Sequence, residues 1–125
     1  MNLNRAATSI LVFGLYLAAV GAILLVVPNL LLAVLGFPPT NEVWIRVVGI
    51  LVLYLAYYFI QSARAGTEVF WRWTTHVRFA LIFFFAGLVL LGLAQPQLLL
   101  LGVADFFGAI WTTLALRADS AVSSA

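Results

Sequence analysis

The sequence predicts an all-α, polytopic membrane protein: a bundle of four transmembrane helices in a single domain covering residues 1–125, with a short interfacial segment after the first helix. Hydrophobic residues make up 66% of the chain and charged residues 8%, against roughly half and a quarter in soluble domains. The apolar residues fall into four stretches of about 20 residues, the length that crosses a bilayer. The links between them are too short to form further domains.

The first span is expected at about residues 8–27, ended by Pro28 and Asn29. Its apolar run from Ile10 to Val27 is longer than the apolar region of a signal peptide, typically about 7–15 residues, so we expect it to be retained. Leu30 to Phe37 is too short to cross a bilayer. We assign that segment to the membrane interface.

The second span is expected at about residues 43–63, after a break at two consecutive prolines. Glu42 and Arg46 lie four apart at its start, and a helix brings such a pair together. A polar link at residues 64–75 should follow, with aromatic and basic residues typical of a membrane surface. The chain's tryptophans are expected at that surface too: Trp44, Trp71, Trp73 and Trp111.

The third span is expected at about residues 75–94, with His76 and Arg78 in its first turn. A turn containing proline reverses the chain at once, so the fourth span, at about residues 97–117, should form an antiparallel hairpin with the third. Residues 118–125 are small and polar, and we expect this tail to be disordered.

The arginines predict the orientation. Five fall on the side shared by the two termini and the middle link, and one falls on the other, which predicts cytoplasmic termini in a multi-pass protein of the cell membrane, the inner membrane in a bacterium. All six stand singly beside apolar segments, so the net charge of +2 does not indicate a nucleic-acid partner. The expected partners are the lipid bilayer and a membrane protein or a second copy of this chain. The two sets are Arg5, Arg64, Arg72, Arg78 and Arg117 against Arg46.

Small residues predict which helix faces meet, because helices in lipid associate by close packing. The fourth span has one such stripe of Gly102, Asp105, Ala109 and Thr112, so Asp105 should point toward neighbouring helices. The other spans have similar stripes: Gly14, Ala18, Gly21 and Ala22 in the first, Arg46, Gly49, Leu53 and Ala56 in the second, and Ala80, Gly87 and Ala94 in the third.

Asp105 is the main candidate site residue, because a carboxylate inside an apolar span is costly. We predict a polar intramembrane pair of Asp105 with Arg46. The pair could be structural, Asp105 could bind a cation, a proton or a head group, or it could be protonated and donate a hydrogen bond. With no cysteine and a single histidine, no metal site and no cofactor are predicted. Secondary candidates are Glu42, His76, Arg78 and Tyr57.

One further pattern is the succession of Gly21, Pro28, Leu35 with Gly36, Arg46 with Gly49, and Asp105 with Gly108. This arrangement resembles that of the DoxX-like group of small four-helix bacterial membrane proteins and their uncharacterised relatives. The resemblance covers most of the chain and implies an accessory or small-hydrophobe-binding role, since some members look like membrane subunits of quinone-linked oxidoreductases. Residues typical of a redox site are not recognised in this sequence.

These observations favour a non-enzymatic membrane protein, an accessory subunit or one that binds a lipid or small hydrophobe. The alternative is an oligomeric small transporter or channel subunit, with Asp105 and Arg46 lining a polar path. A third hypothesis is that the protein is a membrane enzyme. The sequence predicts no catalytic residues, because it shows no paired nucleophile and base and no phosphate-binding loop.

Overall fold

The computed structural model describes residues 3–123 as five α-helices, which confirms the all-α fold class. Four of these helices are long and apolar enough to cross a membrane. The short one, α2, occupies the segment that the sequence marks as too short to cross. The helices are α1 (Arg5–Val26), α2 (Pro28–Leu35), α3 (Trp44–Ala65), α4 (Glu68–Leu90) and α5 (Leu98–Ser123).

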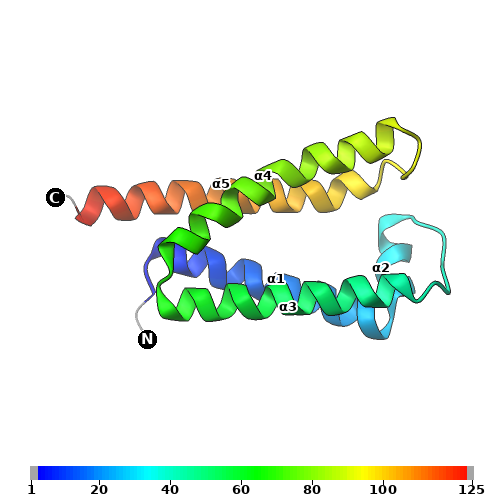
Figure 1. Ribbon diagram of the computed structural model, residues 1–125, viewed down its shortest axis with the longest axis horizontal. Helices are drawn as coiled ribbons and strands as arrows, with labels where there is room; N and C mark the ends of the chain where they lie inside the picture. Colours follow the sequence, from blue (N-terminus) through cyan, green and yellow to red (C-terminus); the bar gives the residue numbers. More distant parts are fainter. Residues whose placement is uncertain (1–2, 124–125) are drawn as a thin grey trace.

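The four long helices run alternately up and down and form two antiparallel pairs, α1 with α3 and α4 with α5 (Figure 1). The pairs lie close together at the end that carries both termini, here called the terminal end. They separate toward the opposite end, where α2 lies, here called the α2 end. The fold is therefore open on one side of its midpoint and closed on the other.

Glycines bring the backbones of each pair into contact. A Cβ atom at Gly49 would lie 2.7 Å from the backbone nitrogen of Leu25 and 2.9 Å from the carbonyl oxygen of Gly21. In the α4–α5 pair, a Cβ atom at Gly102 would lie 2.8 Å from Cδ1 of Ile82. These close approaches confirm the predicted inward positions of the three glycines, and they explain the tight α1–α3 pairing.

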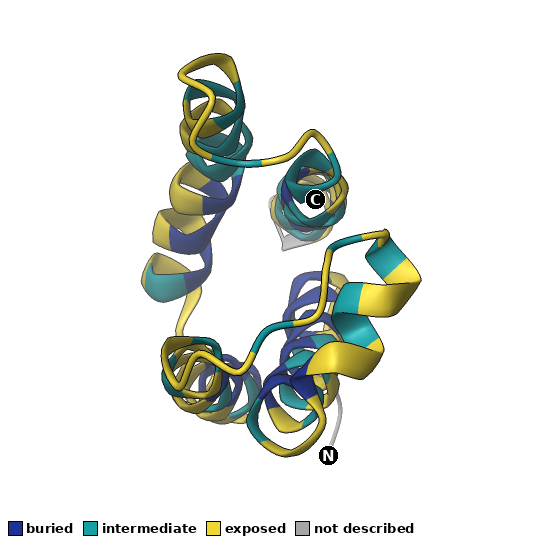
Figure 2. Ribbon diagram, turned by 90° about the vertical axis from the view of Figure 1, so that its right-hand side faces the viewer, coloured by how far each residue is buried: buried dark blue, intermediate teal, exposed yellow. Residues whose placement is uncertain are grey.

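The core lies at the terminal end, where both pairs meet. Figure 2 shows buried residues on the faces that the helices turn toward one another. Trp71 is 1% exposed and donates a hydrogen bond from Nε1 to Oγ of Ser62 at 3.2 Å. Trp71 is thus a core residue and not a surface anchor, whereas the other three tryptophans are exposed. The core residues are Ala6, Ala7, Ile10, Phe13, Leu17, Ala56, Phe59, Ala63, Trp71 and Ala115.

The polar link predicted at residues 64–75 is mostly helix. Gly66 has a φ of 73°, the left-handed conformation that glycine adopts readily, and donates its N–H to the carbonyl of Ser62 at 2.9 Å. This turn ends α3, and α4 begins at once. Glu68 and Arg72 then pair across one helical turn at 3.6 Å, both exposed. The polar residues are therefore the outward face of the start of α4.

The two later helices also differ from the predicted bounds. α4 ends at Leu90, and Gly92 with a φ of 75° begins the reversal before residue 94. α5 continues to Ser123, where the sequence predicts a disordered tail from residue 118. Its last turns are held by Asp119, whose carboxylate accepts a hydrogen bond from the backbone N–H of Ala6 at 3.0 Å. Residues 124–125 of the predicted tail lie outside the described part of the chain.

The buried face of α4 is not its predicted small-residue stripe. Its buried residues are Trp71, Thr74, Thr75 and Arg78, all in its first half. A Cβ atom at Gly87 would meet nothing within 4 Å. The separation of the two pairs explains the difference, because the second half of α4 lies toward the α2 end, where the pairs are farther apart (Figure 1).

Candidate functional site: a cavity between the helix pairs

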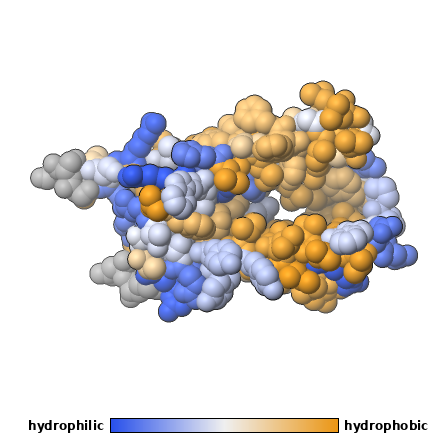
Figure 3. Space-filling view, in the orientation of Figure 1, coloured by the Kyte–Doolittle hydropathy of each residue, from blue (hydrophilic) through white to orange (hydrophobic). Residues whose placement is uncertain are grey.

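A cavity of about 240 Å³ lies between the two pairs, next to the core. Figure 3 shows a gap between the two halves of the molecule toward the α2 end, where the surfaces of both halves are largely hydrophobic. All four long helices contribute to its wall, which is apolar except for three side chains, Thr74, Arg78 and Asp105. The lining residues are Phe13, Leu17, Leu55, Phe59, Phe70, Trp73, Thr74, Val77, Arg78 and Asp105.

The cavity opens sideways, between α3 and α4. Three of its lining residues are largely exposed at the molecular surface: Leu55 at 48%, Trp73 at 60% and Val77 at 68%. Toward the α2 end one exposed hydrogen bond links the two halves, in which the side-chain amide nitrogen Nε2 of Gln97 donates to the carbonyl of Gly36 at 2.9 Å. The three exposed lining residues mark an opening of the cavity between the middles of α3 and α4.

Arg78 lies at the inner side of this cavity and is 3% exposed. It stands in the middle of α4 because that helix begins at Glu68, so it is not in a first turn as the sequence predicts. Its Nε donates to the carbonyl of Thr74 at 3.4 Å, and its Nη2 donates to Oγ1 of Thr74 at 3.1 Å. Nη2 also donates to Oγ1 of Thr112 on α5 at 3.0 Å.

A hydroxyl contact extends this network to α1. Oγ of Ser9 lies 2.8 Å from Oγ1 of Thr112, and it donates to the carbonyl of Ala6 at 2.7 Å. Ser9 and Thr112 are both buried. Buried polar groups beside the cavity thus join α1, α4 and α5. The hydroxyl of Thr112 on α5 lies between Ser9 of α1 and Arg78 of α4.

Aromatic rings hold the guanidinium from the α1–α3 side. Its central carbon lies 4.7 Å from the ring centre of Phe13 and 5.6 Å from that of Phe59, both distances at which a cation is attracted to the face of a ring. Gly108 of α5 leaves space on the other side, because a Cβ atom there would lie 2.9 Å from Phe13 and 3.3 Å from Nη1 of Arg78. The position of Arg78 is therefore fixed on both sides.

One nitrogen of Arg78 has no acceptor. Nη1 is buried, and among the described residues nothing accepts its hydrogen bonds. Asp105 lines the same cavity as Arg78. Within residues 3–123, however, the structure gives no ion pair of 4.0 Å or less between Arg78 and Asp105. The cavity thus has an unsatisfied donor and a carboxylate that do not meet.

The structure does not bring together the predicted pair of Asp105 and Arg46. Nη1 of Arg46 donates to the carbonyl of Leu25 at 2.5 Å and to that of Val26 at 3.2 Å, at the end of α1. Arg46 is exposed and lies outside the cavity. The arginine that shares a cavity with Asp105 is Arg78, which the sequence suggests only as a secondary candidate.

The other candidates lie apart from this cavity. Glu42 precedes α3 and is exposed, and it forms no ion pair with Arg46 in the described chain. Tyr57 is exposed and contacts the ring of Tyr58, with ring centres 6.1 Å apart. His76 is exposed and lines a surface groove with Arg72 and Arg117 at the terminal end.

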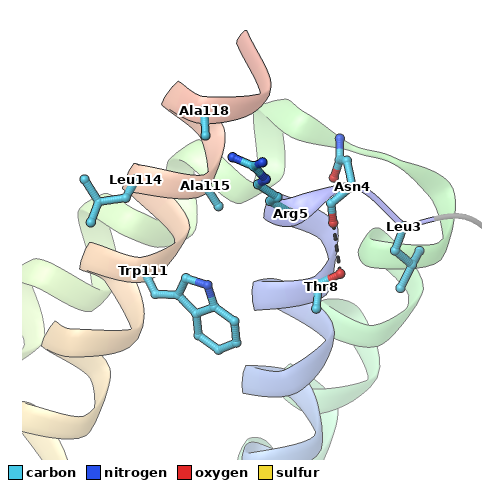
Figure 4. A pocket seen from close by; sticks show the side chains of 8 residues that line it. All are labelled: Leu3, Asn4, Arg5, Thr8, Trp111, Leu114, Ala115 and Ala118. Carbon is cyan, nitrogen blue, oxygen red and sulfur yellow. Dashed lines mark hydrogen bonds between the residues drawn. The ribbon is translucent and has the colours of Figure 1, made fainter. Parts of the chain in front are cut away.

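A second surface groove lies at the terminal end between the start of α1 and the second half of α5 (Figure 4). It is lined by Arg5, Asn4 and Thr8 from the α1 side and by Trp111 from α5. Asn4 caps α1 by accepting from the N–H of Ala7 at 2.8 Å. Thr8 also donates to the backbone carbonyl of Asn4 at 3.0 Å, so these two polar side chains are used by the helix end itself. The cavity beside Arg78, with its buried unsatisfied donor, is the stronger candidate site.

No group of three or more His, Asp or Glu side chains in residues 3–123 is placed to hold a metal ion. Comparisons with models of protein families, with curated proteins and with solved structures found no match. The functional argument therefore rests on the geometry of this chain.

Proposed function

We propose that this chain is a small multi-pass membrane protein that binds a lipid-like molecule in the cavity between its helix pairs. One observation carries the proposal: an apolar cavity, open to the side at the middle of the long helices, contains a buried arginine with an unsatisfied donor. Buried polar groups are nearly always satisfied by protein or water. A bound head group would satisfy this one.

The apolar side chains exposed on the surface of the molecule support its assignment to a membrane. Large apolar side chains are exposed along all four long helices, and less than two fifths of the residues in each apolar window are buried. Large apolar patches on a surface indicate contact with a membrane or partner. In the proposed topology the terminal end is cytoplasmic, because Arg5, Arg64, Arg72 and Arg117 lie there and Arg46 lies at the α2 end. Arg78 is left out of this count of arginines on each side, because it is buried in the middle of α4 and not in a link between helices.

The position of the cavity mouth supports a lipid-like ligand. Leu55 lies midway along α3, and Val77 lies roughly 14 Å from the start of α4 at a rise of about 1.5 Å per residue. In a bilayer this mouth would face lipid chains and not water. A molecule already dissolved in the membrane could enter without crossing a polar region. The accessory role that the DoxX-like resemblance implies is compatible with such binding and stays part of the proposal.

The test is whether the protein retains a bound lipid at this place. The protein is purified in mild detergent and examined by native mass spectrometry, with the bound molecules identified after release. We expect a stoichiometric lipid-like adduct. Leu55→Trp should reduce it severalfold, because the larger ring fills the mouth of the cavity.

Leu51→Trp is the matched control. Leu51 lies one helical turn from Leu55, is exposed at 55% and does not line the cavity. This variant should retain the adduct at the wild-type level. Equal adducts in both variants, or none in the wild type, would rule out the proposed site.

A further inference from the structure

The polar groups of the cavity limit the chemistry of its ligand. Arg78 offers the two N–H bonds of Nη1, and among the described residues nothing accepts them. Asp105 offers acceptor oxygens, and no side chain in residues 3–123 is shown donating to them. A head group that satisfies both must accept a hydrogen bond and also donate one.

The charges of the cavity are already balanced. It contains one guanidinium and one carboxylate, and no other ionisable side chain lines it. An anionic head group near Arg78 would also lie near Asp105, and a cationic head group near Asp105 would lie near Arg78. In an apolar surrounding such an added charge would be left without compensation. A neutral head group avoids this penalty.

A hydroxyl group is the smallest head group that meets both conditions, because it has one donor and two acceptor lone pairs. The cavity of about 240 Å³ is smaller than the roughly 300–1,000 Å³ of most small-molecule sites. It therefore suits a small head group and the first part of a chain. The rest of the chain would pass between Leu55 and Val77, which are partly exposed at the mouth.

We propose that the cavity selects an uncharged, long-chain lipid with a hydroxyl head group, whose oxygen accepts from Nη1 of Arg78 and whose hydrogen is donated to Asp105. This inference rests on the proposed function and specifies its ligand class. It differs from a simple apolar pocket, which would bind molecules of equal chain length without regard to the head group.

Three probes of equal chain length separate the possibilities: 1-hexadecanol, hexadecanoic acid and hexadecylamine. Each is titrated into delipidated protein in detergent at pH 7.5, and binding is measured by displacement of a fluorescent alkyl probe. We expect hexadecanol to bind about tenfold more tightly than the acid or the amine. Tighter binding of the acid would overturn the inference in favour of an anion site at Arg78.

Charge variants provide a second, independent readout. Asp105→Asn leaves Arg78 as the only charge, so the preference should change to hexadecanoic acid. Arg78→Gln leaves Asp105, so the preference should change to hexadecylamine. His76→Gln, in the surface groove of the terminal end, should leave the wild-type order unchanged. If the variants fold and the order stays the same in all of them, the head group does not meet these residues.

The outcomes distinguish this inference from the function on which it rests. Equal binding of all three probes, reduced by Leu55→Trp, would retain the lipid site and reject the head-group selection. Binding of none of them, with no displacement of the fluorescent probe, would reject both. If either charge variant fails to fold, the comparison of the three probes on the wild-type protein decides the question alone.

Discussion

Arg78 of α4 and Thr112 of α5 are joined by a buried hydrogen bond of 3.0 Å from Nη2 to Oγ1. The same Thr112 hydroxyl lies 2.8 Å from that of Ser9 on α1. One hydroxyl thus connects the α4–α5 pair to the α1–α3 pair at the inner side of the cavity. Few other polar contacts join the two pairs in the described chain, so this one is important for their relative position.

Thr112→Val should therefore destabilise the protein, by about 1–3 kcal/mol, because it leaves the Nη2 donor and the Ser9 hydroxyl with fewer partners. Thr113→Val is the control. Thr113 donates only to the carbonyl of Ala109 in its own helix, at 2.8 Å, so its replacement should cost less. The measurement is the free energy of unfolding in mixed detergent micelles. Equal losses in the two variants would contradict a bridging role for Thr112.

The α1–α3 contact leads to a second prediction. Gly49→Ala should lower stability by about 1–3 kcal/mol, because its new methyl group would meet backbone atoms of Leu25 and Gly21 that have no freedom to move aside. Gly87→Ala should be neutral or slightly stabilising, since no atom lies within 4 Å of its added Cβ and alanine favours the helix. Thermal unfolding in detergent compares the two. A tolerated Gly49→Ala would mean that the helices are farther apart than described.

Asp105 should be energetically coupled to Arg78 and not to Arg46. In the double-mutant cycle of Asp105→Asn with Arg78→Gln, removing both charges should cost less than the sum of the single losses, with a coupling of about 0.5–3 kcal/mol. With Arg46→Gln the losses should add to within about 0.5 kcal/mol, because Arg46 binds carbonyls at the end of α1. Unfolding of delipidated protein gives both cycles. Coupling to Arg46 alone would restore the pair that the sequence predicts.

The proposed topology predicts where reporters will be found. Fusions made after Leu35 and after Pro96 should report the outer side, and a fusion after Gly66 should report the cytoplasm, because the arginines favour a cytoplasmic terminal end. Paired alkaline phosphatase and fluorescent-protein fusions measure this. The reverse pattern at all three sites would invert the orientation and leave the helix arrangement intact. A mixed pattern would contradict the four-span threading.

The number, order and type of the long helices could be predicted from the sequence. Four apolar runs of bilayer length produce four long helices, and the α2 segment is short because proline and glycine punctuate it. The inward positions of Gly21, Gly49 and Gly102 could also be predicted, since close packing of helices depends on small residues. One contact of the site was open to prediction as well. In a hairpin centred on Pro96, Arg78 and Thr112 are about equally far from the turn and should face each other.

Which arginine shares a cavity with Asp105 follows from the packing of the helices and could not be predicted from the sequence. Composition does not distinguish Arg46 from Arg78, because both are single arginines near apolar runs. The partner of Asp105 depends on where α4 begins. Because α4 begins at Glu68, Arg78 lies in the middle of this helix and not in its first turn. The partner of Asp105 depends also on the separation of the two helix pairs, because this separation leaves a cavity beside Phe13 and Phe59. These are long-range packing relations between helices, and local periodicity carries no information about them.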